Sequence, residues 1–380
     1  MISKGITIGI NGSMLDDKPT GVGVYSFNLI NNLSSIYLEN NNQITVFTPT
    51  TNSLSSQVKI VKLSRYLQSS TYGKLAAFYR FAWNTFYYPL VARKFDLLIS
   101  PTTHGSFFLD NQIITIHDLL SLKFNNISIH QRFYFKYFLP ALIHKAKYII
   151  AVSENTKKDI IRFFDCPVDK IKVIHNGYDL EMYYPLDENK FEIEKAYGLR
   201  NYLLAVGPTY PHKNFELLID AYASMDKSFK QQHPLLIAGG KTTYLNILKR
   251  YVTAKHLDNC IYFAGYVPLN LMPSLYREAF ALVFPSLYEG FGIPLLEAMA
   301  SGCPVIVSDA SSMPEVCSEA AVYFNPKDKA ALCNAIKYLD SNANERSLLI
   351  ARGFLQAKKF SWKKMAEAFN TLIESSIKNN

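Results

Sequence analysis

Two carboxylates eight residues apart flank a glycine-rich turn in the second half of the chain. Glu289 precedes the turn and Glu297 follows it, within the run EGFGIPLLEAMASGCPV. A helix is expected to begin near Ile293, because Pro294 is tolerated in a first helical turn and Gly302 suits a helix end. The free N–H groups at the start of that helix favour an anion. We therefore expect an anion site between Glu289 in the loop and Glu297 in the first turn of the helix.

Carboxylates beside an anion site repel the anion unless cations or hydroxyl groups accompany it. A sugar nucleotide carries such hydroxyl groups together with its diphosphate. An isolated EGFG loop is explained equally well by a glycine-containing turn before a helix with a favourably placed glutamate. The other motifs of the chain decide between these interpretations.

The run around Glu289 and Glu297 strongly resembles the signature of the retaining glycosyltransferases of group 1, family 4. Five further stretches match motifs of that family in the family's order: TGVGVY at 20–25, IHD at 116–118, VSENT at 152–156, HNGYD at 175–179 and VGPTYPHKN at 206–214. Together the six motifs extend over most of the chain. The resemblance implies an α/β protein of the GT-B fold, with two Rossmann-like doubly wound domains that face each other across a cleft.

The resemblance also implies roles for individual residues. Lys213 would bind the donor diphosphate as a point charge and neutralise the leaving group. Glu297 would hold the ribose hydroxyls, and Glu289 would hold hydroxyls of the transferred sugar. His117, at the end of an expected strand, would contact the sugar near the reacting carbon. A histidine that only caps a strand is the alternative for His117.

The donor-binding residues implied by the resemblance come from three loops. The glycines among them let the backbone approach the phosphates closely. The catalytic set is His117, Lys213 and Glu289. The donor-binding set is Gly21, Gly23, His212, Lys213, Asn214, Phe291, Gly292, Ile293, Pro294, Leu295 and Glu297.

The donor loop departs from the family pattern at one position. Many family members carry an arginine directly after the glycine that corresponds to Gly207, whereas this chain has Pro208 there and His212 before Lys213. Lys213 is therefore the single firm cation of this loop. Either another cation and the helix dipole compensate, or the diphosphate is held less tightly than is usual in the family.

No metal or other cofactor is expected. The chain has no DxD motif and no tight cluster of histidines and carboxylates, so its sequence does not demand a divalent cation. The family resemblance agrees, because these enzymes bind diphosphate without metal. No serine or cysteine nucleophile elbow is present. For the family, the usual mechanism is attack on the face that the phosphate leaves, with no covalent enzyme intermediate.

Short apolar runs alternate with helix-length segments, which indicates parallel sheets covered by helices. Strands are expected at 6–10, 44–47, 97–100, 113–116, 148–152, 171–174, 203–206, 235–238, 261–263, 281–284, 304–307 and 321–324. We expect an acceptor-side domain over 1–180 and a nucleotide-sugar domain over 181–361. Residues 176–187 are the expected linker, and a helix over about 362–377 is expected to pack back on the first domain.

Composition limits the class of protein and its compartment. A chain of 380 residues with 49% hydrophobic and 19% charged residues suits two globular domains and excludes a disordered tether. Five cysteines without a CxxC pair favour a reducing compartment. No run reaches the roughly 18 uncharged apolar residues that span a bilayer. We expect a cytoplasmic protein, with peripheral attachment to the inner face of the cell membrane as an open alternative.

The first half of the chain is the basic half. Residues 1–180 contain 19 Lys and Arg against 11 Asp and Glu, a net charge of +8. The excess points to an acidic partner or serves only solubility. Residues 72–94 interleave aromatic rings with cations that include Arg80, and residues 132–139 repeat the pattern. Such segments lie in a membrane interface or pack as amphipathic helices on the sheet. Stacking on single-stranded nucleic acid is disfavoured by the glycosyltransferase motifs, so no nucleic-acid partner is expected.

The sequence therefore predicts a retaining, metal-independent glycosyltransferase. It would move a sugar from a nucleotide-diphosphate sugar to a saccharide or lipid-linked acceptor in bacterial surface polysaccharide synthesis, with an anionic membrane surface as a further expected partner. GDP-mannose is the first expected donor, because PHKN with FPSLYEGFG resembles O-antigen mannosyltransferases, and UDP-hexose is the second. An epimerase or phosphorylase of the same fold and a non-catalytic binding protein remain as alternatives.

Overall fold

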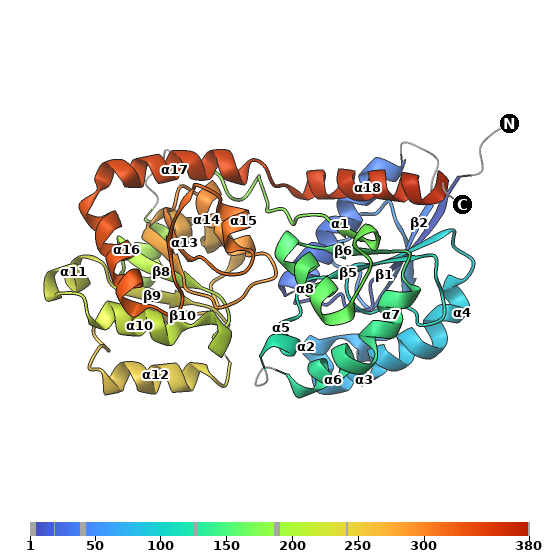
Figure 1. Ribbon diagram of the computed structural model, residues 1–380, viewed down its shortest axis with the longest axis horizontal. Coiled ribbons are helices and arrows are strands. Elements are labelled where there is room, and N and C mark those ends of the chain that lie inside the picture. Colours follow the sequence, from blue (N-terminus) through green and yellow to red (C-terminus); the bar gives the residue numbers. More distant parts are fainter. Residues whose placement is uncertain are drawn as a thin grey trace. The chain divides into compact units, whose positions relative to one another are not determined.

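The chain folds into two compact α/β units. The structure is a computed structural model that describes residues 5–18, 20–38, 43–124, 128–185, 191–240 and 242–378. One unit, here called the N-terminal unit, contains residues 1–176 and 362–380, and the C-terminal unit contains residues 177–361 (Figure 1). Residues 186–190, which include the end of the expected linker, lie outside the described residues.

The N-terminal unit is built on a parallel sheet of seven strands in the order β3-β2-β1-β4-β5-β6-β7. Its strands are β1 Thr7–Asn11, β2 Gln43–Thr48, β3 Lys59–Lys62, β4 Leu97–Ser100, β5 Gln112–Ile116, β6 Tyr148–Ala151 and β7 Ile171–Val173. Its helices are α1 Gly21–Leu38, α2 Ser69–Tyr72, α3 Lys74–Ala82, α4 Tyr88–Ala92, α5 Leu120–Lys123, α6 Ile129–Tyr137, α7 Leu139–Lys145, α8 Glu154–Phe164 and α18 Trp362–Lys378. Short 3-10 helices span η1 Arg65–Leu67 and η3 Val168–Lys170, and a π-helical turn spans η2 Trp83–Tyr87.

The C-terminal unit is built on a parallel sheet of six strands in the order β10-β9-β8-β11-β12-β13. Its strands are β8 Tyr202–Val206, β9 Leu235–Ala238, β10 Ile261–Gly265, β11 Ala279–Phe284, β12 Val305–Ser308 and β13 Ala321–Phe324. Its helices are α9 Glu192–Tyr197, α10 Phe215–Ala223, α11 Lys227–Gln232, α12 Leu245–Ala254, α13 Met272–Arg277, α14 Ile293–Ala300, α15 Met313–Cys317, α16 Lys329–Ser341 and α17 Ala343–Ala357, with 3-10 helices η4 Pro211–Lys213 and η5 Leu269–Leu271.

Both sheets are doubly wound, as the alternation of apolar runs predicts. All twelve expected strands are present, and their side chains are mostly buried because helices cover both faces. The thirteenth strand, β3, was not predicted. It lies at the edge of its sheet and has the sequence KIVK, in which three of the four residues are exposed. An edge strand of this kind has too few buried apolar residues to give a sequence signal.

The last helix, α18, packs on α1 within the N-terminal unit, and Figure 1 shows the two helices side by side. Its apolar stripe includes Trp362, Phe369 and Ile373, which are buried. The ring of Trp362 meets Tyr25 of α1 edge to face at 6.3 Å. The chain therefore returns to its first unit after it has completed the second.

The aromatic segment 72–94 forms α3, η2 and α4, and its two faces differ. Asn84 and Tyr88 are buried, whereas Phe86 and Leu90 are exposed. Arg80, one of the cations that the membrane interpretation of this segment places at the interface, is buried instead. Its side chain is only 6% exposed, and its Nη1 donates to the carbonyl oxygen of Leu67 at 2.6 Å and to Ser69 Oγ at 2.8 Å. The guanidinium therefore lies on the inner face of α3, away from solvent.

The second aromatic segment, residues 132–139, spans most of α6 and the start of α7. Phe135 and Leu139 point into the core, whereas Phe133 and Tyr137 are exposed. Within the described residues, no helix is both long enough and apolar enough to cross a membrane.

Candidate active site

The loops expected to bind the donor emerge from two neighbouring strands at the centre of the C-terminal sheet. From β8 the strand order runs through β9 to β10 on one side, and from β11 it runs through β12 to β13 on the other. The loops after β8 and β11 thus leave the sheet in opposite directions at the carboxyl ends of adjacent strands. This switch point is where doubly wound sheets bind ligands. Residues 207–214 and 285–292 form these two loops.

An ion pair joins the two loops. Lys213 Nζ lies 2.6 Å from Glu289 Oε1, and both side chains are largely shielded from solvent. Such short charge-assisted contacts are strong where water is excluded. The ammonium group also lies 5.1 Å from the ring centroid of Phe284, the last residue of β11. The structure thus brings together two of the three residues expected to be catalytic.

Glycine at position 207 leaves room for the lysine side chain. Gly207 has φ +136°, and a Cβ placed there would lie 3.4 Å from Lys213 Cε. A Cβ on Gly239 would overlap the carbonyl oxygen of Gly207, so the loops after β8 and β9 are in close backbone contact. These glycines fix the path of the donor loop below the ion pair.

The residues on either side of Lys213 hold the loop in place. Asn214 adopts a left-handed conformation, and its amide donates to the carbonyl oxygens of Pro285 at 3.0 Å and Pro326 at 2.8 Å. The structure therefore places the Asn214 amide as a loop anchor. His212 is buried and stacks on Tyr210, and its carbonyl accepts from the N–H of Leu287 at 2.8 Å. Burial and the charge of Lys213 lower the pKa of His212 to about 4, so its imidazole is neutral at neutral pH and adds no second cation.

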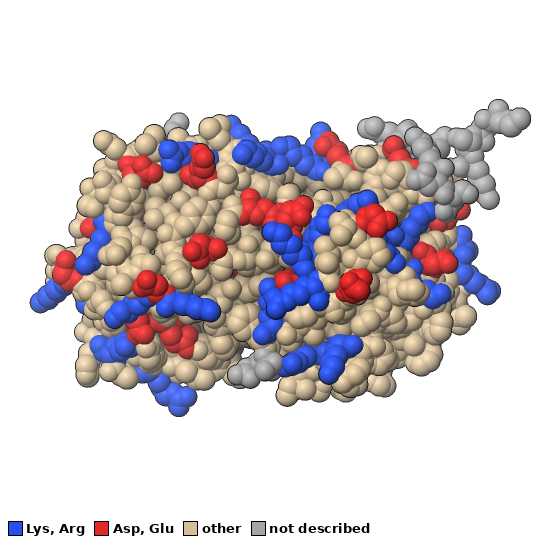
Figure 2. All heavy atoms as spheres, viewed as in Figure 1, with Lys and Arg blue, Asp and Glu red and all other residues tan. Residues whose placement is uncertain are grey.

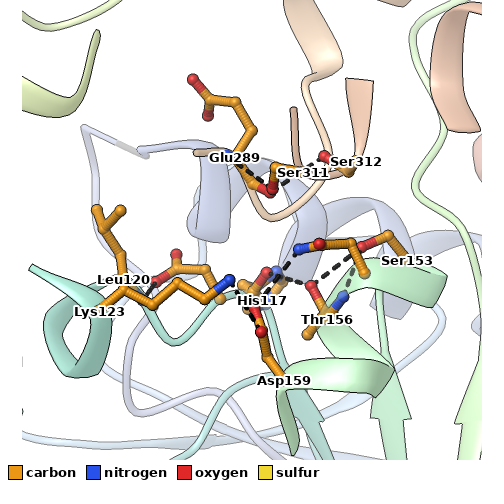
Figure 3. Close-up of polar contacts among 11 residues, drawn as sticks. His117, Leu120, Lys123, Ser153, Thr156, Asp159, Glu289, Ser311 and Ser312 are labelled. Carbon is orange, nitrogen blue, oxygen red and sulfur yellow. Dashed lines mark hydrogen bonds and ion pairs between the residues drawn. The ribbon is translucent and has the colours of Figure 1, made fainter. Parts of the chain in front are cut away.

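Two serines that the sequence analysis did not single out form hydrogen bonds with the backbone of the EGFG loop. Ser311 Oγ donates to the carbonyl oxygen of Glu289 at 2.6 Å and accepts from the Glu289 N–H at 3.2 Å. Ser312 Oγ lies within 3.1 Å of the same carbonyl oxygen and 2.9 Å of that of Phe291. Figure 3 shows both hydroxyl groups directed at the backbone of Glu289. Neither serine belongs to a motif noted in the sequence. Both lie between β12 and α15, and the fold brings this segment into contact with the EGFG loop.

Helix α14, which is expected to bind the anion, begins where it was predicted. Gly292, with φ +106°, precedes α14, and Ile293, Pro294 and Leu295 form its first turn. Placing Glu297 in the first turn was wrong. Glu297 is the fifth residue of α14, so it lies in the second turn of a helix with 3.6 residues per turn. Its carboxylate therefore lies deeper along the helix than the N-terminal N–H groups.

Glu297 lies among tyrosine hydroxyls. Tyr276 donates to Glu297 Oε2 at 2.8 Å, and Tyr183 supplies a second hydrogen bond. Burial nevertheless raises the pKa of Glu297 to about 7, with a smaller contribution from the negative charge of Asp179. The carboxyl group therefore holds its proton to a higher pH than an ordinary glutamate does. A ligand that donates hydroxyl hydrogens to it would favour the carboxylate form.

In the N-terminal unit, His117 directly follows β5. Its Nε2 lies 2.8 Å from the carbonyl oxygen of Pro101, so this nitrogen carries the hydrogen, and Nδ1 is left as an acceptor in the neutral ring. Burial lowers the pKa of His117 to about 4, which keeps the ring neutral. Tyr25 of α1 meets the ring edge to face at 4.6 Å. His117 is thus positioned as a hydrogen-bonding group and not as a cation.

The VSENT motif at 152–156 holds the loop after β5, which contains His117. Ser153 caps α8 by accepting from the Thr156 N–H at 3.0 Å, and Thr156 Oγ1 donates to the carbonyl oxygen of His117 at 3.4 Å. Farther along α8, Asp159 pairs with Lys123 at 2.9 Å (Figure 3). The motif therefore joins the start of α8 to the loop after β5. Lys123 and Asp159 had not been noted in the sequence.

The glycine motif of the first half lies in the first turn of α1. Gly21 is exposed, and a Cβ placed on it would meet no atom within 4 Å. Gly23 follows two residues later in the same turn. The space beside Gly21 is therefore open to a ligand. No group of three or more His, Cys, Asp or Glu side chains arranged to hold a metal occurs among the described residues.

Two family models match the chain, one over each half. Residues 187–356 match the family described as "Glycosyl transferases group 1", and residues 19–182 match "Glycosyltransferase Family 4". The chain belongs to these glycosyltransferases. It is 35% identical over 243 residues to the O-antigen chain mannosyltransferase RfbU of Salmonella typhimurium, a match that covers 64% of this chain and 65% of that protein. It is 29% identical to O-antigen chain mannosyltransferase B of Escherichia coli, over 90% and 93% of the two chains.

Solved structures of similar fold confirm the GT-B architecture of this glycosyltransferase. The sucrose-phosphate synthase of Thermosynechococcus elongatus superposes with a TM-score of 0.77 at 18% identity, over 99% of this chain and all of that one. HepE of Anabaena, solved with UDP and glucose, gives a TM-score of 0.73 at 17% identity, over 97% of this chain and all of that one. At these identities the likeness shows the fold alone.

The raised pKa of Glu297 predicts how stability depends on pH. An ordinary glutamate has a pKa of about 4.5, so between that value and 7 the folded protein binds more protons here than the unfolded chain does. The Glu297 contribution therefore makes the unliganded protein less stable as pH rises through this interval. Glu297→Gln should remove that contribution. The free energy of unfolding of the variant, compared with that of the unsubstituted protein, should therefore be higher at pH 8 than at pH 5.

Urea unfolding of both proteins across this pH range tests the prediction. Glu319→Gln, at an exposed position, is the control. Equal pH profiles for all three proteins would contradict the environment described for Glu297.

Proposed function

We propose that the protein is a retaining glycosyltransferase that uses a nucleotide-diphosphate sugar, with mannose from GDP-mannose as the first candidate donor. The acceptor is a saccharide or a lipid-linked saccharide in the synthesis of a bacterial surface polysaccharide. The observation that carries the proposal is the Lys213–Glu289 ion pair, which joins the loop after β8 to the loop that precedes α14 at the switch point of the C-terminal sheet. The names of the O-antigen mannosyltransferase relatives support the choice of mannose.

The ion pair suggests how the donor is received. The diphosphate is a stronger anion than one carboxylate, so it competes with Glu289 for Lys213 and adds contacts to the N–H groups at the start of α14. Glu289 is then released toward hydroxyl groups of the sugar. In this proposal the lysine and the helix terminus neutralise the leaving diphosphate, and a metal ion is not required.

The proposed chemical step is the one that the family resemblance implies. The bond from the anomeric carbon to the phosphate oxygen breaks, and its electron pair stays on the departing diphosphate. The acceptor oxygen bonds to the anomeric carbon on the face that the diphosphate leaves, and its proton passes to a phosphate oxygen. The anomeric configuration is retained without a covalent intermediate. His117 is neutral and holds a sugar hydroxyl through Nδ1, so it acts by positioning its substrate.

A panel of sugar nucleotides tests the proposed donor. Saturation at 100 times the dissociation constant should stabilise the protein by about 2.7 kcal/mol, visible as a rise in melting temperature. GDP-mannose should give the largest shift, and UDP-glucose is the second candidate. NMR of the product should show the donor's anomeric configuration retained, and EDTA should leave the rate unchanged. An epimerase would convert the donor without any acceptor, and a binding protein would leave it intact, so either result would overturn the proposal.

Separate variants of the ion pair should differ in nucleotide binding: Lys213→Ala should weaken it, whereas Glu289→Gln should not. Lys213→Ala removes the cation, and the rate of transfer should fall by a factor equivalent to about 2–4 kcal/mol. Glu289→Gln frees Lys213 from its competing carboxylate, so a nucleoside diphosphate should bind at least as tightly as in the unsubstituted protein while kcat falls. Steady-state kinetics and calorimetric titration measure both. If Glu289→Gln weakens diphosphate binding as much as Lys213→Ala does, exchange of partners at Lys213 is ruled out.

Attachment to an anionic membrane surface is a further proposal, supported by exposed aromatic side chains. Phe86 is 70% exposed, and Tyr87 and Leu90 lie exposed beside it. The N-terminal half carries the net charge of +8. On the face in view, Figure 2 shows a broad uncharged area where Figure 1 places α4 and α7. Rings at the interface with cations nearby suit an anionic leaflet.

Vesicle sedimentation tests the membrane proposal. Binding should require anionic lipid and weaken as salt rises, because exposed charges are screened. Phe86→Ala/Leu90→Ala should bind several-fold less and remain folded, since both side chains are exposed. Tyr266→Ala, which removes an exposed ring of the C-terminal unit, is the matched control. Equal binding to neutral and anionic vesicles at low salt would count against the proposal.

A further inference from the structure

A cavity of about 670 Å³ lies between α3 and α6 in the N-terminal unit. Seven phenylalanine and tyrosine side chains line it: Phe78, Phe81, Phe107, Phe133, Tyr134, Phe135 and Phe138. Phe78 and Phe133 are 67% and 57% exposed and mark its rim. A mostly apolar cavity with a few polar groups at fixed positions is typical of a small-molecule site.

The polar groups lie at the buried end of this cavity. Arg80 and Asn84 line it, and both are at least nine-tenths buried. Asn84 Oδ1 accepts from Asn11 Nδ2 at 2.6 Å, and the same Nδ2 lies 2.7 Å from the carbonyl oxygen of His104, another lining residue. Asn11 is the last residue of β1. The polar end is thus fixed to the carboxyl edge of the sheet at its switch point between β1 and β4.

Arg80 is the unusual member of this group. Its Nη1 is satisfied by Leu67 and Ser69, but its Nε is buried without a hydrogen-bond partner. Within the described part of the chain it forms no ion pair. The Asp16 carboxylate exerts a Coulomb attraction on Arg80 but is not paired with it. This carboxylate accepts hydrogen bonds from the backbone N–H and the hydroxyl of Ser70. A buried guanidinium without a carboxylate is costly, and its planar fork matches a carboxylate or phosphate.

The cavity also adjoins the loop that positions His117. Pro101, whose carbonyl oxygen binds His117, begins the loop after β4, and Thr103 and His104 of that loop line the cavity. Tyr134 donates its hydroxyl hydrogen to the carbonyl oxygen of Thr103 at 2.7 Å. A ligand in the cavity would therefore contact the loop whose Pro101 carbonyl oxygen binds His117.

We propose that this cavity binds the acceptor saccharide and that Arg80 contacts an anionic substituent of that acceptor, either a phosphate or a carboxylate. The aromatic wall offers ring faces to the apolar C–H face of a pyranose. The anionic substituent supplies the counter-ion that Arg80 lacks, and it gives the basic first half of the chain an acidic partner. Naming the occupant as the acceptor rests on the proposed transferase function.

Three small sugars serve as probes: methyl glucuronide, glucose 1-phosphate and the neutral methyl glucoside. They are titrated by calorimetry into protein already saturated with a nucleoside diphosphate, so that the donor site is occupied. At least one anionic sugar should bind about tenfold more tightly than methyl glucoside, the scale of one charge-assisted contact. Preference for the glucuronide identifies a carboxylate, and preference for glucose 1-phosphate identifies a phosphate.

Variants then locate the binding. Arg80→Met keeps much of the side-chain volume and should abolish the preference for an anionic sugar. Phe133→Ala removes a rim ring and should weaken all three sugars several-fold, whereas Phe86→Ala, an exposed ring outside the cavity, should change nothing. If Arg80→Met does not fold, the comparison of Phe133→Ala with Phe86→Ala still decides, because both side chains are exposed.

The outcomes separate this inference from the proposed function. If nucleoside diphosphates bind but neither anionic sugar binds more tightly than methyl glucoside, the assignment of Arg80 is overturned and the transferase proposal stands. If Phe133→Ala behaves like Phe86→Ala, the cavity is not the site. If no sugar nucleotide binds, the proposed function fails, whereas anionic sugars measured without nucleotide should still distinguish Arg80→Met from the unsubstituted protein.

Discussion

The ion pair between Lys213 and Glu289 is the interaction on which the rest of the donor half-site depends. It bridges the loops after two adjacent strands where the sheet changes direction. The surrounding contacts serve to hold those loops still: Asn214 binds the carbonyl of Pro285, and Ser311 and Ser312 bind the backbone of the EGFG loop. A preorganised charge pair of this kind is ready to exchange partners when an anion arrives, because little of its surroundings has to move.

Three charged groups of the unliganded protein are better suited to a bound ligand than to its absence. Among the described residues, Lys213 pairs with one carboxylate, Glu289, which has its own proposed role. Glu297 has its pKa raised to about 7 by burial, and Arg80 lies buried without an ion-pair partner in the described part of the chain. Sites built for binding commonly retain such locally unfavourable features while the remaining structure supplies stability. These residues therefore indicate where individual ligand groups bind, whereas the fold indicates only the general region.

Local patterns in the sequence predicted the elements but not their long-range partners. The apolar runs give twelve strands, and Pro294 with its glycines gives the start of α14. The strand β3 was not predicted, because an exposed edge strand contains no apolar run. The contacts of Ser311 with Glu289 and of Arg80 with Leu67 span 22 and 13 residues, and that of Asn11 with Asn84 spans 73. Spacing along the chain carries no information about such contacts. The hydrogen bonds of Ser311 and Ser312, the burial of Arg80 and the cavity between α3 and α6 could therefore be found only from the structure.

The central claim is that the donor diphosphate displaces Glu289 from Lys213. A crystal structure of the protein with the nucleoside diphosphate of its donor tests this most directly. We expect Lys213 Nζ within hydrogen-bond distance of a phosphate oxygen, with its 2.6 Å contact to Glu289 broken or clearly lengthened. A bound diphosphate that leaves the ion pair intact and lies away from the first turn of α14 would contradict the account.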